Sequence, residues 1–284
     1  MERAYTLGLY EKAMPSDLTW REKLLAAKEA GFDFVEISID ESDEKLARLD
    51  MSTAERMALV REMSEAGLPI RSMCLSGHRK YPLGSSDPAV CTRSIEIMEK
   101  AVRLAADLGV RIIQLAGYDV YYEDSTPDTA ARFLENLSFA AMLAAQSGVL
   151  LGFETMETPF MNTVEKAMRY VKLVDSPYLQ VYPDAGNLTN AAVASGSDVC
   201  ADLRMGAGHL IAMHLKETMP GVFREVPFGT GHVDFKTLIK QAWSLGVRRY
   251  VAECWYTGSP DWEQDLALAQ KLLSGCLNKE DLRC

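Results

Sequence analysis

Four acidic or imidazole residues stand at the ends of apolar runs in the second half of the chain. They are Glu154 in LLGFE, Asp184 in LQVYPD, His214 in IAMH and Glu253 in RYVAE. Each run has the length and composition of a strand buried on both faces. Three carboxylates and one imidazole suit Mn²⁺, Co²⁺, Mg²⁺ or Zn²⁺ better than a metal selected by thiolates. The pattern therefore predicts one divalent metal ion held by these four residues.

Each of the four also has an explanation that involves no metal. A carboxylate at the end of a strand often caps the following helix, and His214 lies between Met213 and Leu215, as a hydrogen-bonded core histidine would. Together they favour the metal, because they interrupt apolar runs at equivalent points of four consecutive units. One buried carboxylate is costly by itself, whereas a cation offsets three at once.

Glu154 and Glu253 belong to the fifth and eighth apolar runs, which face each other across the mouth if eight strands close into a barrel. Two carboxylates on opposite sides of a bound carbon are what two-base proton transfer requires, one removing a proton and the other delivering one to the opposite face. A metal beside them would polarise a carbonyl and stabilise an enediolate. We therefore expect both glutamates to be catalytic and the reaction to invert a stereocentre.

A second set of residues is cationic. Lys12, the run His78-Arg79-Lys80 and Lys216 all follow apolar runs, where they could hold a phosphate at one end of a substrate. The alternative is that the three-residue basic run is a solvated loop, which is its usual fate. The glycines of Gly229-Thr230-Gly231-His232 add little, because such turns are common for conformational reasons alone.

The elements that must position these residues recur along the chain. A helical stretch ends at glycine and an apolar run follows at once, as in EAGFDFVEI (29–37), EAGLPIRSM (65–73) and DLGVRIIQL (107–115). Glycine suits the left-handed position after a helix, so each junction is typical of a helix-to-strand turn. Five such junctions and three further apolar runs, at 6–10, 177–184 and 209–217, give eight strand candidates. Eight strands without a linker predict an α/β fold, a single (β/α)8 TIM barrel over residues 1–284. A doubly wound sheet with an extra domain is the alternative.

Helical patterns fill the intervals between the predicted strands. We expect helices at 18–30, 53–66, 87–108, 126–146, 163–174, 193–205, 235–245 and 262–273.

Composition excludes several classes of protein. The chain has 284 residues, 48% of them hydrophobic, and a formal net charge of −10. It has no run long enough to span a membrane and no signal-peptide core, and its six scattered cysteines indicate reduced thiols, so we expect a cytoplasmic protein. The acidic balance argues against nucleic-acid binding. The 14 methionines permit a homodimer interface.

The sequence also resembles a known family, the L-ribulose-5-phosphate 3-epimerases of the xylose-isomerase-like TIM barrels. The resemblance rests on segments from the first predicted strand to the last third of the chain. These segments are GLYEKAMP (8–15), GFDFVEISID (31–40), MCLSGHRKYPLGS (73–85), IQLAGYDVYYED (113–124), YPDAGNL (182–188), HLKETMPGVF (214–223) and VPFGTGHVDF (226–235).

The resemblance implies an isomerase that interconverts L-xylulose 5-phosphate and L-ribulose 5-phosphate in the degradation of L-ascorbate or related sugar acids. Its wider superfamily holds the metal with Glu, Asp, His and Glu, which fall here on the four strand-end residues already identified. Glu157 is a candidate substrate contact. Asn187 stands where free-ketose epimerases often place a substrate-binding histidine.

Other functions stay open from the sequence. A free-ketose 3-epimerase or a sugar isomerase would share the metal site and differ only at the phosphate end. A DNA-repair endonuclease would need more histidines than the four in this chain. A scaffold without activity would use the carboxylates only as caps.

Overall fold

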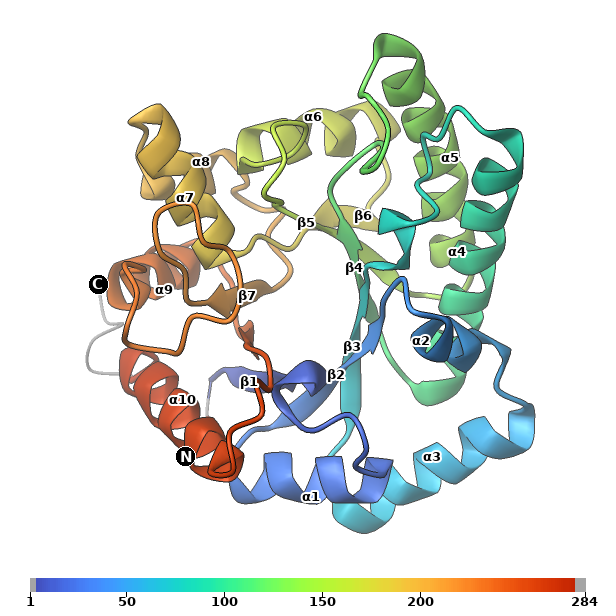
Figure 1. Ribbon diagram of the computed structural model, residues 1–284. Helices are drawn as coiled ribbons and strands as arrows, with labels where there is room; N and C mark the ends of the chain where they lie inside the picture. The colour runs from blue at the N-terminus through green and yellow to red at the C-terminus, as the bar shows by residue number, and fades with distance from the viewer. Residues whose placement is uncertain (1–3, 279–284) are drawn as a thin grey trace.

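Eight parallel strands form the centre of the computed structural model, which describes residues 4–278. The helices surround these strands as an outer ring (Figure 1). This confirms the predicted TIM barrel. The strands are β1 (Thr6–Tyr10), β2 (Phe34–Ile39), β3 (Ile70–Leu75), β4 (Ile112–Ala116), β5 (Leu150–Glu154), β6 (Leu179–Val181), β7 (Met213–Lys216) and β8 (Arg249–Glu253).

Hydrogen-bonded neighbours follow the order β6-β5-β4-β3-β2-β1-β8-β7. The remaining junction, between β6 and β7, has no continuous ladder. It is closed by two isolated parallel bridges, Val181 with Leu210 and Asp184 with His214. One of the two bridges at this seam thus joins two residues of the predicted metal site.

Ten α-helices are present among the described residues. They are α1 (Trp20–Glu29), α2 (Asp43–Ala47), α3 (Thr53–Ala66), α4 (Pro88–Leu108), α5 (Pro127–Gln146), α6 (Val164–Val174), α7 (Ala185–Ser195), α8 (Val199–Met205), α9 (Phe235–Ser244) and α10 (Trp262–Cys276).

The prediction of one continuous helix over 193–205 is wrong. The chain forms α7 and α8 there instead, separated by Gly196, whose φ of 69° places it in the left-handed region. Asp198 then caps α8 by accepting hydrogen bonds from the amides of Cys200 and Ala201. A glycine followed by a capping aspartate is the end of one helix and the start of another.

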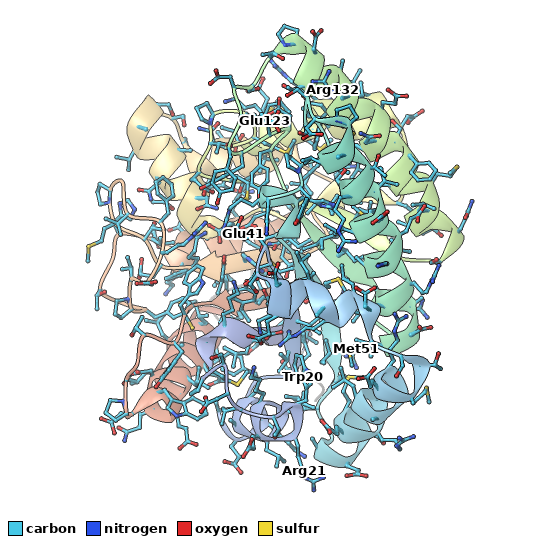
Figure 2. All side chains as sticks on the ribbon, turned by 45° about the vertical axis from the view of Figure 1, so that its right-hand side comes forward. Trp20, Arg21, Glu41, Met51, Glu123 and Arg132 are labelled. Atoms are coloured by element: carbon cyan, nitrogen blue, oxygen red, sulfur yellow. The ribbon has the colours of Figure 1, made fainter. Side chains whose placement is uncertain are left out.

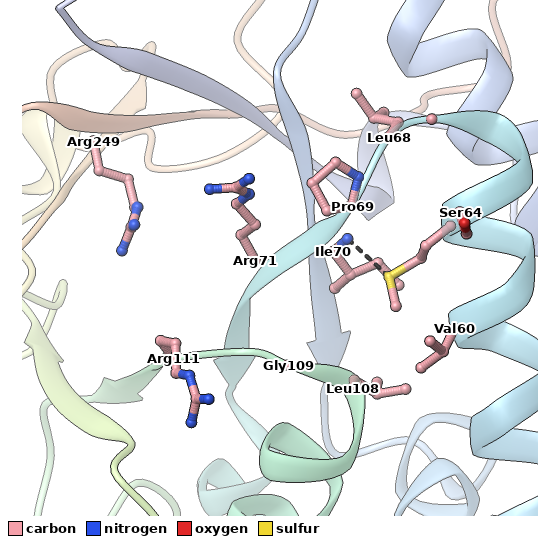
Figure 3. A pocket seen from close by; sticks show the side chains of 12 residues that line it. Val60, Ser64, Leu68, Pro69, Ile70, Arg71, Leu108, Gly109, Arg111 and Arg249 are labelled. Atoms are coloured by element: carbon pink, nitrogen blue, oxygen red, sulfur yellow. Dashed lines mark hydrogen bonds between the residues drawn. The ribbon is translucent and has the colours of Figure 1, made fainter.

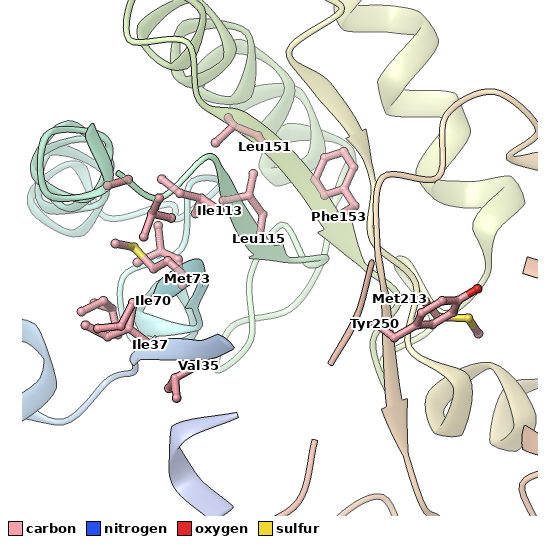
Figure 4. Close-up of a cluster of buried hydrophobic side chains, with 14 of the residues drawn as sticks. Val35, Ile37, Ile70, Met73, Ile113, Leu115, Leu151, Phe153, Met213 and Tyr250 are labelled. Atoms are coloured by element: carbon pink, nitrogen blue, oxygen red, sulfur yellow. The ribbon is translucent and has the colours of Figure 1, made fainter. Parts of the chain in front are cut away.

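The main hydrophobic core lies between the strands and the surrounding helices. Figure 4 shows part of it, with Ile113 and Leu115 of β4 beside Leu151 and Phe153 of β5. A second cluster fills the barrel interior. It consists of Tyr10, Phe34, Cys74, Ile112, Tyr182, Ala212 and Val251. The interior is therefore packed, and only the strand ends are available for a site.

Polar contacts join the loops after β3 and β4. Glu123 and Arg132 lie at one end of the molecule (Figure 2). Glu123 accepts hydrogen bonds from the Ser85 hydroxyl (2.5 Å) and the Ser86 amide (3.0 Å), while Arg132 Nε donates to the Ser85 carbonyl (3.0 Å). These contacts fix one side of the barrel mouth.

Glu11 fixes the other side. Its buried carboxylate lies 2.6 Å from both Lys45 Nζ and Arg48 Nη1, and it accepts the Ser38 amide at 2.8 Å. Burial alone would raise the pKa of Glu11, but the charges and hydrogen bonds of Arg48 and Lys45 outweigh it and lower that pKa. The carboxylate therefore ties the end of β1 to α2 and to β2.

Among residues 4–278, no helix combines the length and the apolar character that a membrane crossing requires.

Substituting Glu11 with Gln should lower the free energy of unfolding by about 3 kcal/mol, because it leaves buried cations without their counter-charge. Since the folded pKa of Glu11 is lowered, this stabilisation is present above the unfolded pKa and is lost as the pH falls through the folded one. Urea unfolding at several pH values measures both effects. The control is Glu65→Gln, which breaks an exposed pair with Arg21 and should cost under about 1 kcal/mol. Equal losses for the two variants would contradict the interpretation.

Candidate metal centre

The four predicted ligands meet at the carboxyl end of the barrel. Glu154 is the last residue of β5, Asp184 precedes α7, His214 lies in β7 and Glu253 ends β8. One ligand atom from each lies within 4.8 Å of the others, and all four residues are buried. The parallel ladders bring strand ends from distant parts of the chain to one edge, as the sequence pattern predicted.

The cluster is tightly packed. His214 Nδ1 is 2.9 Å from Glu253 Oε2 and 3.9 Å from Glu154 Oε1. Lys216 Nζ lies 3.3 Å from Asp184 Oδ1 and 3.5 Å from Glu253 Oε2. One lysine ammonium thus lies beside a cluster of three carboxylates.

The cluster fits a divalent cation on two observations. Asp184 Oδ2 is buried without a hydrogen-bond partner among the described residues, although Asp184 Oδ1 accepts the Asn187 amide at 2.6 Å. Three buried carboxylates around one imidazole are also the hard donor set that such ions prefer. A dication would satisfy the unpaired oxygen and offset the crowded negative charge.

The pKa values of the three carboxylates in the cluster are shifted in different directions. Burial, followed by the charge of Glu253, raises the pKa of Glu154. Burial also raises the pKa of Asp184. For Glu253, burial is outweighed by the nearby Lys216 and His214, which lower its pKa. Of the two glutamates, Glu253 therefore ionises more readily.

A further carboxylate, Glu36 in the middle of β2, supports the histidine. Glu36 Oε1 is 2.5 Å from His214 Nε2, and Glu36 Oε2 accepts the Tyr182 hydroxyl at 3.0 Å. If Nε2 carries the proton and donates to Glu36, Nδ1 faces the cluster as the acceptor and possible metal ligand. In the structure Nδ1 lies 3.0 Å from Gln114 Nε2 and 2.9 Å from Glu253 Oε2. Sequence reasoning missed Glu36, although a carboxylate at the centre of the apolar strand FVEISI was a visible signal.

A small cavity of about 50 Å³ lies over the cluster. Its lining includes five of the predicted substrate contacts, together with Tyr10, Trp255, Phe223 and Arg224. The five are Lys12, Arg79, Glu157, Asn187 and Lys216. Two of these carry a buried polar atom without a hydrogen-bond partner among the described residues, namely Arg79 Nε and Asn187 Oδ1. Both atoms are available to a ligand.

The other two predicted contacts do not line this cavity. His78 is buried, with Nε2 3.1 Å from the Ser94 carbonyl, and burial lowers its pKa to about 4, so it is neutral near pH 7. Lys80 is half-exposed and lies 3.7 Å from Asp43. The short 3₁₀ turn Gly77–Arg79 advances about 120° per residue, so only Arg79 of the basic run reaches the cavity.

The arginine that sequence reasoning missed is Arg224, in the loop after β7. It lies 3.4 Å from Glu157, whose carboxylate also accepts the Tyr121 hydroxyl at 3.1 Å. Arg79 lies over the Tyr121 ring, 4.9 Å from its centroid. Arg79 and Arg224 thus approach the same acidic and aromatic pair from different loops.

Comparison with known sequences gives close relatives. A family model described as the xylose isomerase-like TIM barrel matches residues 24–274. The chain is 46% identical over 258 residues to the L-ribulose-5-phosphate 3-epimerase UlaE of Salmonella heidelberg (strain SL476), covering 90% of this chain and 89% of the relative. It is 45% identical over 273 residues to UlaE of Escherichia coli O139:H28 (strain E24377A / ETEC), covering 95% and 94%.

Solved structures share the fold at lower identity. A D-psicose 3-epimerase from Clostridium cellulolyticum H10, solved with D-tagatose, aligns with a TM-score of 0.81 at 15% identity, covering 96% of this chain and 99% of that one. A structure of an L-ribulose 3-epimerase aligns with a TM-score of 0.77 at 19% identity, covering 96% and 94%. These matches support the same barrel architecture.

Replacing Glu36 with Gln should weaken divalent-metal binding by about ten- to a hundredfold, because it removes the charged partner that orients His214. Titration of the metal-free protein with Mn²⁺, in competition with a chelating indicator, measures this directly. Tyr182→Phe is the matched control, since it removes only the hydroxyl that binds Glu36 and should have a smaller effect. Unchanged Mn²⁺ affinity in Glu36→Gln would argue against this role.

Proposed function

This chain belongs to the L-ribulose-5-phosphate 3-epimerase family of xylose isomerase-like TIM barrels, and on that premise we propose that it interconverts L-xylulose 5-phosphate and L-ribulose 5-phosphate. The observation that carries the proposal is the pair of glutamates, Glu154 and Glu253, that end β5 and β8 within one buried metal-capable cluster. Inversion at C3 requires proton transfer on both faces of one carbon.

Glu154, Asp184, His214 and Glu253 would hold one divalent ion. When bound, such an ion polarises a substrate carbonyl and stabilises the negative charge that develops when the neighbouring C–H bond breaks.

The two glutamates would move the proton at C3. In each direction, one carboxylate must start ionised to accept the proton, and the other must start protonated to return one from the opposite face. Their roles exchange when the reaction runs in reverse. The unequal surroundings suit this division, because Lys216 lies against Glu253 whereas burial favours a protonated Glu154.

Lys216 and Asn187 would orient the sugar. The Lys216 ammonium lines the cavity next to the cluster, where it can donate a hydrogen bond to an oxygen that gains negative charge. Asn187 is held by its own side chain, since Nδ2 donates to the Thr155 carbonyl at 2.7 Å. Its free Oδ1 can therefore accept from a substrate hydroxyl.

The phosphate would lie between Arg79 and Arg224. Both guanidiniums line the cavity, and Arg79 has an unpaired Nε, so a phosphate could accept charge-assisted hydrogen bonds from two sides. Lys12 lines the same cavity and is paired with Asp40. Of the basic run His78-Arg79-Lys80 expected to bind the phosphate, we therefore keep only Arg79, and we add Arg224 from the loop after β7.

Substrate entry requires movement. A cavity of about 50 Å³ is well below the roughly 300 Å³ at which ordinary ligand pockets begin, so it is too small for a pentulose phosphate. Phe223 and Arg224, on the long loop after β7, are the lining residues whose displacement would enlarge it. This loop would open for the substrate and exclude water once the substrate is bound.

Glu154→Gln and Glu253→Gln should each reduce turnover at C3 by about a hundred- to ten-thousandfold, as expected for loss of one acid–base group. The assay follows L-ribulose 5-phosphate formation and, in D₂O, deuterium incorporation at C3. Glu123→Gln, which changes a carboxylate remote from the cluster, is the control. Because these glutamates are also candidate metal ligands, bound metal is measured in each variant. A variant that binds metal and keeps full turnover would refute the two-base scheme.

Arg79→Ala and Arg224→Ala should each raise KM for the phosphorylated pentulose about ten- to a hundredfold, because each loses a charge-assisted hydrogen bond worth about 1.5–3 kcal/mol. Activity on unphosphorylated L-ribulose should change little. Lys80→Ala, from the same basic run but outside the cavity, is the control. Equal wild-type activity on the free and phosphorylated sugars would favour a free-ketose epimerase instead.

A further inference from the structure

A second and larger cavity lies at the opposite end of the barrel, among the amino ends of the strands. Its volume is about 480 Å³. Three arginines line it, Arg71 of β3, Arg111 just before β4 and Arg249 at the start of β8. Figure 3 shows all three guanidiniums on one side of the pocket. The metal-capable cluster lies at the carboxyl ends of the strands, so the two cavities are separate.

These arginines lack the acidic partners that other cations of the protein have. Arg48 and Arg56 are paired with Glu11 and Asp107 at 2.6 and 2.7 Å. Across residues 4–278, no carboxylate forms an ion pair with the three guanidiniums of the cavity. Three positive charges therefore share one pocket with no carboxylate of residues 4–278 paired to them, in a chain whose net charge is −10.

Arg249 is the least exposed of the three. Its Nε is buried and has no hydrogen-bond partner among the described residues. Burial, and then the positive charge of the nearby Arg71, lower its pKa. A buried donor without an acceptor costs free energy, and a bound anion would remove both that cost and the repulsion.

The remainder of the cavity is apolar. Val60, Met63, Leu68 and Leu108 contribute to its lining. Figure 3 shows Val60, Leu68 and Leu108 on the other side of the pocket from the arginines. The Met63 thioether is held in place because its sulfur accepts the Ile70 amide at 3.0 Å. The pocket thus combines a cationic side with a fixed apolar wall.

We infer that this cavity is a second ligand site, which binds a small organic anion. The phosphate or carboxylate group of the ligand binds Arg71, Arg111 and Arg249, and its nonpolar part packs against the apolar side chains around Met63. Guanidiniums bind either oxyanion through paired hydrogen bonds. Both kinds of head group therefore fit, and the apolar wall distinguishes such a ligand from a bare inorganic ion. The site depends on neither the metal nor the epimerase chemistry.

Calorimetric titration of the full-length protein with phenyl phosphate, benzoate and inorganic phosphate tests the site. Phenyl phosphate or benzoate should bind more tightly than inorganic phosphate, and the stronger of the two identifies the head group. Arg71→Ala and Arg111→Ala remove exposed side chains, and each should weaken this binding about tenfold, the loss of one charge-assisted hydrogen bond. Their epimerase activity should stay at the wild-type level.

Two controls separate this site from the phosphate pocket of the proposed epimerase. Arg61→Ala removes an exposed arginine of α3 outside the cavity and should leave binding unchanged. Arg79→Ala should leave the aryl-anion binding intact as well. The inference would be overturned if Arg79→Ala lost binding while Arg71→Ala bound as tightly as the wild type. It would also be overturned if none of the three anions bound saturably.

Discussion

The crowding of three carboxylates in the interior is the constraint on which the site depends. Glu154, Asp184 and Glu253 are buried within 4.8 Å of one another and of His214, and like charges so placed repel strongly in a medium that screens them poorly. Lys216 compensates part of this charge. A dication would compensate the rest, so the same arrangement that is costly without an ion gives the site its affinity for one.

Neighbouring elements hold that arrangement in place. Asp184 is the N-cap of α7, so its carboxylate is oriented by the helix as well as by the cluster. His214 is fixed by Glu36 from the other side of the barrel interior. Lys216 and Glu253 are directly paired in the register of β7 and β8. The metal-capable cluster is therefore assembled mainly from strand ends. The loops contribute mainly the arginines that we propose bind the substrate phosphate.

The sequence was sufficient for the barrel and for the four candidate ligands, because strand ends can be read from apolar runs and all of them meet at one edge. It was insufficient for Glu36, since a residue in mid-strand shows no sign of which distant partner it faces. His78 and Lys80 were misplaced because a 3₁₀ turn separates three adjacent side chains. Arg224 was missed because the conformation of a long loop depends on contacts that no local pattern encodes.

The seam between β6 and β7 has a consequence for the dynamics of the barrel. Only isolated bridges close it, one of them between Asp184 and His214, so these strands have the fewest shared hydrogen bonds to resist local opening. An ion bound by both residues would act as a cross-link over this gap. Amide hydrogen exchange at the seam would then slow with metal occupancy, so that the weakest junction of the barrel is protected when the enzyme is loaded.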